Sequence, residues 1–255
     1  WVHYPQGLGG LGAPRSLQVV VDTELEAAGA PDNDPRRIGI GLGMAAPTIL
    51  KYGTEEQKQR FLRPLWTGEE VWCQLFSEPG AGSDLASLAC RAERDGDEWI
   101  LTGQKVWSTW AHNADFGVTL ARTDPDAQKR KGISYFLLDL HQPGVEVRAL
   151  RHITGEVDFN ETFLDGARVP DFNRVGDVGE GWKVANATLS GERQMVSGSG
   201  SGGVDRIGGS GAERLVVNCG APGPSHAPWR DAARKTAAHS TVTLDDRSSC
   251  RFVRG

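Results

Sequence analysis

Two short segments of this 255-residue chain combine glycine, hydroxyl and aromatic residues in a pattern suited to a planar ligand with oxygen-rich edges. The first, residues 74–87, leads from an apolar stretch into a loop with glycines at 80 and 82. Because glycine permits positive φ and close backbone approach, successive N–H groups there can converge on a phosphate or on ring carbonyl oxygens. The second, residues 105–109, reads Lys-Val-Trp-Ser-Thr and supplies an aromatic face beside two hydroxyl groups.

Neither segment is decisive alone. A polar turn between two strands has the same composition as residues 78–84, and Trp107 has an ordinary alternative as a core aromatic. The pair indicates a binding site only if the two segments are adjacent in space. We therefore expect Ser77 and Trp107 to lie on the same side of their domain.

A longer series of motifs removes much of this ambiguity. The loop reads Ser-Glu-x-x-Ala-Gly-Ser-Asp, with Ser77, Glu78, Ala81, Gly82, Ser83 and Asp84 at its defined positions. Further motifs follow in order at residues 103–107, 132–138, 143–147, 159–163, 169–170 and 179–183. In these motifs the chain resembles the acyl-CoA dehydrogenase family, flavoenzymes that desaturate acyl-CoA thioesters between Cα and Cβ. The resemblance covers roughly residues 7–216, and residues 75 and 76 depart mildly from the family pattern.

The local patterns and the resemblance predict the same α+β fold. Apolar residues at helical spacing occupy 17–25, and Thr54-Glu-Glu-Gln57 is a capping box for a helix that Pro64 should end. Short apolar runs then predict strands at 71–76, 99–102, 116–122, 134–140 and 145–150, with a hairpin turn at Asp95-Gly96. Helical spacing returns near Glu180.

The predicted domains follow from this order. We expect residues 1–70 to form part of an N-terminal helical domain, 71–178 a β-barrel domain and 179–216 the start of a C-terminal helical domain, and the resemblance implies that the β-barrel binds flavin and acyl-CoA. Glycine-rich sequence at 197–203 and 208–211 interrupts the last of these, as a flexible linker or as a close approach of helix and cofactor. The chain begins at Trp1 with neither an initiator Met nor a leader, so we expect a truncated family member without a secretory signal.

Residues 217–255 depart from the pattern. They hold a single Leu and no Ile or Met, while Arg, Ser, Ala, His and Pro are abundant. Such a composition cannot supply an amphipathic helical bundle. It indicates a disordered tail, a shifted reading frame of a gene rich in G and C, or a natural divergent tail.

The resemblance implies FAD as cofactor and assigns a set of residues to it. Ser77 would meet the pyrimidine end of the ring system, Trp107 would pack against it, and Thr109 would offer its hydroxyl or N–H near N5. Ser83 would contact both cofactor and acyl-CoA. The complete cofactor-binding set implied is Gln74, Leu75, Phe76, Ser77, Gly82, Ser83, Trp107, Ser108 and Thr109.

The catalytic base is less directly indicated. Most of the family place it on a late C-terminal helix, which has no counterpart in this chain. A minority place a glutamate directly before an arginine on the first helix of that domain, and Glu192-Arg193 matches that arrangement. Glu192 is therefore the candidate base and Arg193 the candidate contact for CoA. The alternative is a solvated Glu-Arg pair on a helix surface.

Bulk properties exclude other classes of protein. The net charge of −5 without a basic cluster argues against a nucleic-acid surface, and no apolar run approaches the roughly 20 residues of a membrane span. The four cysteines, at 73, 90, 219 and 250, show no metal-binding spacing, so no metal site and no disulfide framework are expected. A cytoplasmic location is the default expectation.

The resemblance implies an oxidoreductase of fatty acid or lipid metabolism that passes electrons from acyl-CoA to an electron-transfer flavoprotein. It also implies a homo- or hetero-oligomer for the intact family member. Two alternatives stay open. One is a truncated, non-catalytic relative that binds flavin or a partner subunit, and the other is an acyl-CoA oxidase or flavin monooxygenase of the same fold.

Overall fold

The computed structural model describes residues 2–30, 39–152, 155–196, 243–244 and 247–248, with the backbone alone for 191–196, 243–244 and 247–248. The chain divides into two units, Trp1–Glu192 and Arg193–Gly255. In the second unit, β9 (Thr243–Leu244) pairs antiparallel with β10 (Arg247–Ser248). The remaining residues of the predicted tail, and both glycine-rich segments, lie outside the described residues. No helix in the described ranges is long and apolar enough to cross a membrane.

The N-terminal part of the first unit is helical, as predicted. It contains α1 (Leu17–Ala27), a π-helical turn (Gly41–Ala45), α3 (Ala46–Tyr52) and α4 (Glu55–Thr67). Helix α1 has no buried residue, although its apolar residues have helical spacing. Helix α4 begins with the predicted capping box, in which Thr54 accepts from the Gln57 N–H and Gln57 accepts from the Thr54 N–H.

The predicted end of α4 at Pro64 is wrong. The helix continues to Thr67 and ends at Gly68, which adopts the left-handed conformation common at helix C-termini. Proline removes one backbone hydrogen bond at this point. Leu65 and Trp66, 1% and 5% exposed, are buried in the core and hold the last turn in place. Tertiary packing therefore outweighs the local cost of the proline.

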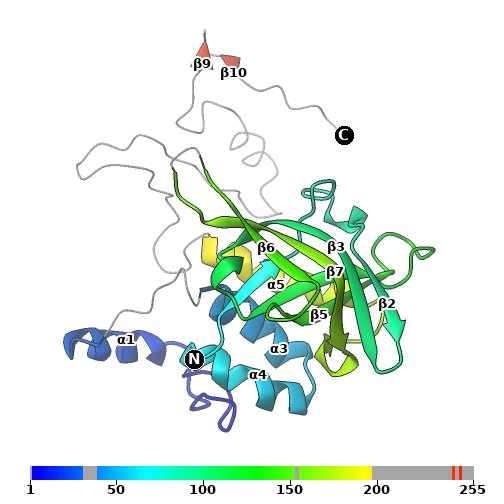
Figure 1. Cartoon of the computed structure of the whole chain (residues 1–255). Coiled ribbons are helices and arrows are strands. Elements are labelled where there is room, and N and C mark those ends of the chain that lie inside the picture. Colours follow the sequence, from blue (N-terminus) through cyan, green and yellow to red (C-terminus); the bar gives the residue numbers. More distant parts are fainter. Residues whose placement is uncertain (1, 31–38, 153–154, 197–242, 245–246, 249–255) are drawn as a thin grey trace. The chain divides into compact units, whose positions relative to one another are not determined.

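The middle part is a mixed sheet of eight strands. They are β1 (Trp72–Leu75), β2 (Arg91–Asp95), β3 (Glu98–Thr109), β4 (Phe116–Arg122), β5 (Ile133–Asp139), β6 (Val145–Leu150), β7 (Phe159–Pro170) and β8 (Arg174–Val175). Their order is β6-β7-β3-β2-β4-β5-β8, with β1 parallel to β4. Figure 1 labels β2, β3, β5, β6 and β7 of this sheet. The hairpin predicted at Asp95-Gly96 joins β2 and β3. The five strands named from the sequence are present, while β2, β7 and β8 were not named individually.

Strands β4 and β5 are buried on both faces. In β5, Ile133, Tyr135 and Leu137 belong to a core shared with the helices, whereas Phe136 and Leu138 belong to a second core enclosed by the sheet. Side chains alternate along a strand, so a strand covered on both sides needs an uninterrupted apolar sequence. Helix α5 (Gly181–Val196) joins the first core through Val184.

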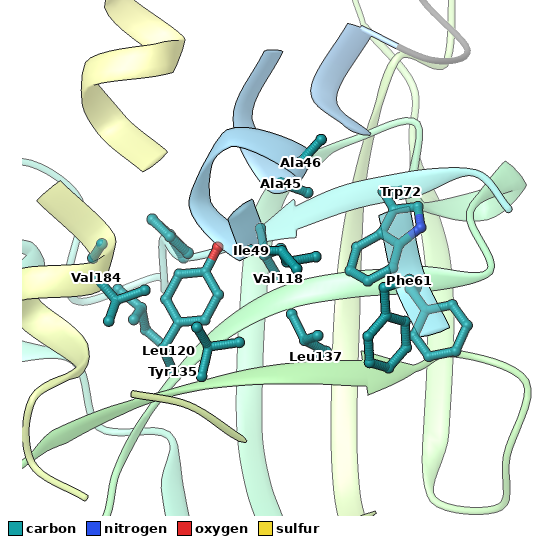
Figure 2. Packing of buried hydrophobic residues seen from close by; sticks show 14 of the residues in the cluster. Ala45, Ala46, Ile49, Phe61, Trp72, Val118, Leu120, Tyr135, Leu137 and Val184 are labelled. Atoms are coloured by element: carbon teal, nitrogen blue, oxygen red, sulfur yellow. The ribbon is translucent and has the colours of Figure 1, made fainter. Parts of the chain in front are cut away.

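Figure 2 shows this first core, in which Ile49 and Ala45 from the helices meet Val118, Leu120 and Tyr135 from the sheet. A hydroxyl network lies within it. The Thr188 hydroxyl of α5 is 2.9 Å from that of Thr48 in α3 and 3.0 Å from that of Tyr135 in β5. Burial raises the pKa of Tyr135, so its hydroxyl stays protonated. The network links three elements that are distant in sequence.

Two tryptophans near the end of β3 adopt left-handed backbone conformations. Trp107 has φ 60° and Trp110 has φ 57°, and they are the only described residues other than glycine with positive φ. The left-handed region costs a residue with a Cβ roughly 1–2 kcal/mol. The first of them falls at a register irregularity between Lys105 and Ser108, where β3 pairs with β7.

We expect Thr188→Val to lower the free energy of unfolding by about 1–2 kcal/mol, because it leaves buried hydroxyl groups without their shared partner. Urea unfolding followed by circular dichroism measures the change. Thr23→Val is the matched control, since the Thr23 hydroxyl bonds to the Val19 carbonyl on the exposed helix α1. Equal losses in the two variants would contradict a role for the buried network.

We expect Trp107→Gly to be more stable than Trp107→Ala by about 0.5–1 kcal/mol. Both variants lose the same aromatic side chain, but only glycine adopts the left-handed conformation without steric cost. The same comparison at Gln104, a regular position of β3, should favour alanine. Urea unfolding of the four variants tests the expectation, and an identical order at both positions would argue against strain at Trp107.

Candidate functional site

The two segments singled out from the sequence are adjacent in the fold. Strand β1 runs parallel to β4, and the chain then crosses to β3, where the Val106 N–H donates to the Ser77 carbonyl at 2.9 Å. Residues 77 and 106 are thus joined by a hydrogen bond, although they are 29 positions apart in the sequence. The two segments are therefore adjacent, as expected, while the prediction that Ser77 and Trp107 lie on the same side of the domain stays a prediction.

The glycine loop is a tight, outward-facing turn. The N–H and carbonyl of Glu78 both pair with those of Ala81, at 3.0 Å each. Gly80 and Gly82 are exposed, and neither adopts the positive φ that the sequence analysis allowed for. A methyl group built on either would meet no protein atom within 4 Å. Their lack of a side chain is therefore not needed for packing and leaves the backbone open to close approach from outside.

Trp107 stands beside this loop as an exposed aromatic. Its side chain is 63% exposed and touches Phe159 edge to face, with ring centroids 5.9 Å apart. Phe159 in turn stacks on His152 at 5.0 Å. This excludes the alternative of an ordinary core aromatic. An exposed tryptophan held in a costly backbone conformation is typical of a functional position.

Three residues of the predicted cofactor set have buried side chains. Leu75 and Phe76 are 0% and 4% exposed, and Phe76 packs edge to face on Tyr135 in the core. Ser108 is fully buried, and its hydroxyl has no hydrogen-bond partner within the described residues. Leu75 and Phe76 each belong to one of the two apolar cores, and the cofactor role of these three residues stays a prediction.

The other predicted cofactor residues are accessible. Gln74, Ser77 and Thr109 are half-buried, and Ser83 is exposed in the loop. The loop beyond Ser83 is tied down by Asp84, which accepts from Lys129 at 2.9 Å and from the Ser87 hydroxyl. Hydrogen bonds from Ser87 and then from Lys129 hold the pKa of Asp84 below its usual range, so this carboxylate stays charged.

Sequence reasoning missed the role of two buried charges behind the loop. Lys105 is fully buried, and its Nζ lies 2.8 Å from Oε1 of Glu78. Glu78 was a motif position without an assigned role, and Lys105 was noted only as a neighbour of Trp107. The available signal was a lysine within the apolar, alternating sequence of β3, at a position that faces inward.

The predicted base and CoA contact lie on α5, but their side chains are outside the described residues. The backbone of Glu192 and Arg193 is helical, as the resemblance implied. Both residues therefore stay predictions.

Three family models match the chain. Residues 1–69 match the acyl-CoA dehydrogenase N-terminal domain, and residues 73–166 match the acyl-CoA dehydrogenase middle domain. Residues 209–255 match a third model, heparinase II/III-like, C-terminal. The first two matches agree with the helical and sheet parts of the first unit. The third covers all of residues 217–255, the sequence that departs from the family pattern.

The chain is similar to acyl-CoA dehydrogenase FadE34 of Mycobacterium tuberculosis, with 53% identity over 76% of this chain and 27% of the relative. Human mitochondrial short-chain specific acyl-CoA dehydrogenase is 34% identical over 72% of this chain and 45% of the relative. A solved structure titled Tcur3481-Tcur3483 steroid ACAD is 37% identical, with a TM-score of 0.65 over 77% of this chain and 50% of its own.

The chain thus spans about half or less of the length of these relatives. The matched domains, the helix-and-sheet architecture and the level of identity agree with one another. In its N-terminal and middle domains, this chain belongs to the acyl-CoA dehydrogenase family, of which it covers only a part.

Proposed function

We propose that this chain carries the flavin-binding face of an FAD-dependent acyl-CoA dehydrogenase. The reaction is α,β-desaturation of an acyl-CoA thioester. The observation that carries the proposal is the hydrogen bond from the Val106 N–H to the Ser77 carbonyl, which joins the loop at residues 77–83 and its exposed glycines to the stretch of β3 that carries exposed Trp107. Family membership makes this chemistry the first candidate.

The residues present fit a flavin ring. A flat aromatic side chain offers a packing surface, and the loop offers backbone N–H groups and the hydroxyl groups of Ser77 and Ser83 at one edge. Gly80 and Gly82 leave room for a ligand at the backbone. When bound, FAD supplies the acceptor for the hydride that leaves Cβ of the substrate.

The protein residues have distinct tasks in this proposal. Trp107 packs against the ring, and Thr109 offers a hydroxyl or N–H at the ring's centre. Glu192 removes the proton from Cα, since a carboxylate base is needed there. Arg193 binds the CoA portion, and Ser83 contacts both ligands.

The same proposal includes the partners implied by the family. Electrons pass from the reduced cofactor to an electron-transfer flavoprotein, and the intact protein is a homo- or hetero-oligomer of cytoplasmic lipid metabolism. Two similar solved structures support the inclusion of these partners. One, 32% identical with a TM-score of 0.66, is titled as an electron transferring flavoprotein, and the other is titled as the ChsE4-ChsE5 complex.

We expect the purified 255-residue chain to bind FAD and to show the two absorbance bands of oxidised flavin. Trp107→Ala should weaken FAD binding about fivefold, because an aromatic contact contributes on the order of 1 kcal/mol beyond burial. Fluorescence titration with FAD measures both affinities. Phe172→Ala, which truncates another exposed aromatic, is the control. Absence of binding by the unaltered chain would favour a non-catalytic relative that binds a partner subunit.

We expect Glu192→Gln to abolish exchange of the Cα protons of butyryl-CoA with deuterium in the presence of FAD, because exchange requires the base. Mass spectrometry of the recovered thioester measures it. Glu180→Gln, an exposed glutamate just before α5, is the matched control and should leave exchange unchanged. Exchange that persists in Glu192→Gln would exclude this residue as the base. In anaerobic and aerobic samples, the rate of flavin reoxidation separates a dehydrogenase from an oxidase or monooxygenase.

A further inference from the structure

The buried ion pair Glu78–Lys105 is unusual in its degree of burial. The Lys105 side chain is 0% exposed and that of Glu78 is 6% exposed. Lysine is almost never fully buried unless it is paired, and desolvation of two charges largely offsets their attraction. Well-packed apolar residues would often stabilise a fold as well or better. Stability alone therefore does not account for this pair.

Its hydrogen bonds converge from three segments. Lys105 donates to the Phe76 carbonyl at 3.2 Å as well as to Glu78. The Glu78 carboxylate also accepts the backbone N–H groups of Ala89 at 2.6 Å and Cys90 at 2.9 Å. The pair thus connects the end of β1, the approach to β2, and β3. Removal of either charge leaves buried backbone groups or the other charge without a partner.

The segments that it connects are the two that form the candidate site. Glu78 follows Ser77 directly and closes the turn with Ala81. Lys105 precedes Val106, whose N–H binds the Ser77 carbonyl. Trp107, the next residue, faces outward from the same stretch of β3. The ion pair therefore lies directly behind the exposed loop and the exposed aromatic.

We infer that Glu78 and Lys105 are positioning residues that fix the spacing between the loop at 77–83 and Trp107. The inference rests on the proposed function, because the spacing matters for a ligand that contacts both. Only an ionised carboxylate fits at position 78. It faces three donors and must accept from all of them, whereas the amide of a glutamine would place its own donor against one.

The test compares Glu78→Gln, Lys105→Met and the double variant Glu78→Leu/Lys105→Met in the full chain. The double variant leaves neither charge buried without its partner, and only the backbone groups of Phe76, Ala89 and Cys90 lose a hydrogen bond. Arg168→Met, which breaks an exposed ion pair with Asp95 and Glu98 on the same sheet, is the control. Hydrogen exchange at the Val106 and Ala81 amides and titration with FAD are measured for each folded variant.

We expect exchange at both amides to be about tenfold faster and FAD binding about tenfold weaker in the folded Glu78 and Lys105 variants. Arg168→Met should match the unaltered chain. A double variant that is as stable as the unaltered chain and binds FAD equally well would overturn the inference, since it would show a structural role only. Unchanged exchange at Val106 and Ala81 would overturn it whatever the titration gives. Failure of the unaltered chain to bind FAD, with faster exchange in the variants, would instead overturn the proposed function and support the positioning of the loop.

Discussion

The burial of β4 and β5 on both faces is the constraint on which the rest of the described structure depends. One face of these strands packs on the helices through Val118, Leu120 and Tyr135, and the other closes the core within the sheet through Phe136 and Leu138. A one-residue slip in β5 would exchange these two sets. The register of β4 with β5 therefore determines the side chains of both cores. Strand β1 pairs with β4, so its position depends on the same two strands.

The position of the candidate site follows from the pairing of β1, β4 and β5. Strand β1 ends at Leu75, while its parallel partner β4 continues. The chain leaves β4 there, and the Ser77 carbonyl accepts a hydrogen bond from the Val106 N–H of β3. The sheet supplies a rigid base, while the loop and Trp107 supply the exposed groups. Burial of polar groups at this junction costs free energy. The groups are the Glu78–Lys105 ion pair and the hydroxyls of Ser108 and Thr162, which have no hydrogen-bond partner within the described residues.

The sequence predicted the elements whose local and tertiary preferences agree. The capping box at Thr54 and the five apolar strands are of this kind, because pattern and burial give the same answer. It failed where tertiary contacts override local chemistry, as in α4, which continues past Pro64 because Leu65 and Trp66 are buried. Strand β7 was missed as a strand since Asn160 and Thr162 put polar side chains on its buried face.

The candidate site also contains residues that the sequence predicted and residues that it did not. Motif resemblance located Ser77, Ser83 and Trp107, but it did not reveal that Ser108 is buried or that Glu78 and Lys105 hold the two segments together. Those facts depend on which side chains are buried where the end of β1 meets β3, and the motif resemblance does not show this burial. For residues 217–255, composition suggested three origins. The match of residues 209–255 to a heparinase II/III-like model adds a fourth account, a segment of a different family joined to this one.

Among the described residues, the buried members of the core enclosed by the sheet all lie between Val71 and Val169. The junction of the loop with β3 is likewise formed by hydrogen bonds among residues 76–106. Within the part of the chain that the structure describes, the junction that we propose to face the flavin is thus stabilised by contacts within its own part of the chain. Proton abstraction and CoA binding, in contrast, are assigned to Glu192 and Arg193, at the boundary with the second unit. Cofactor binding and catalysis should therefore respond separately to changes on the two sides of that boundary.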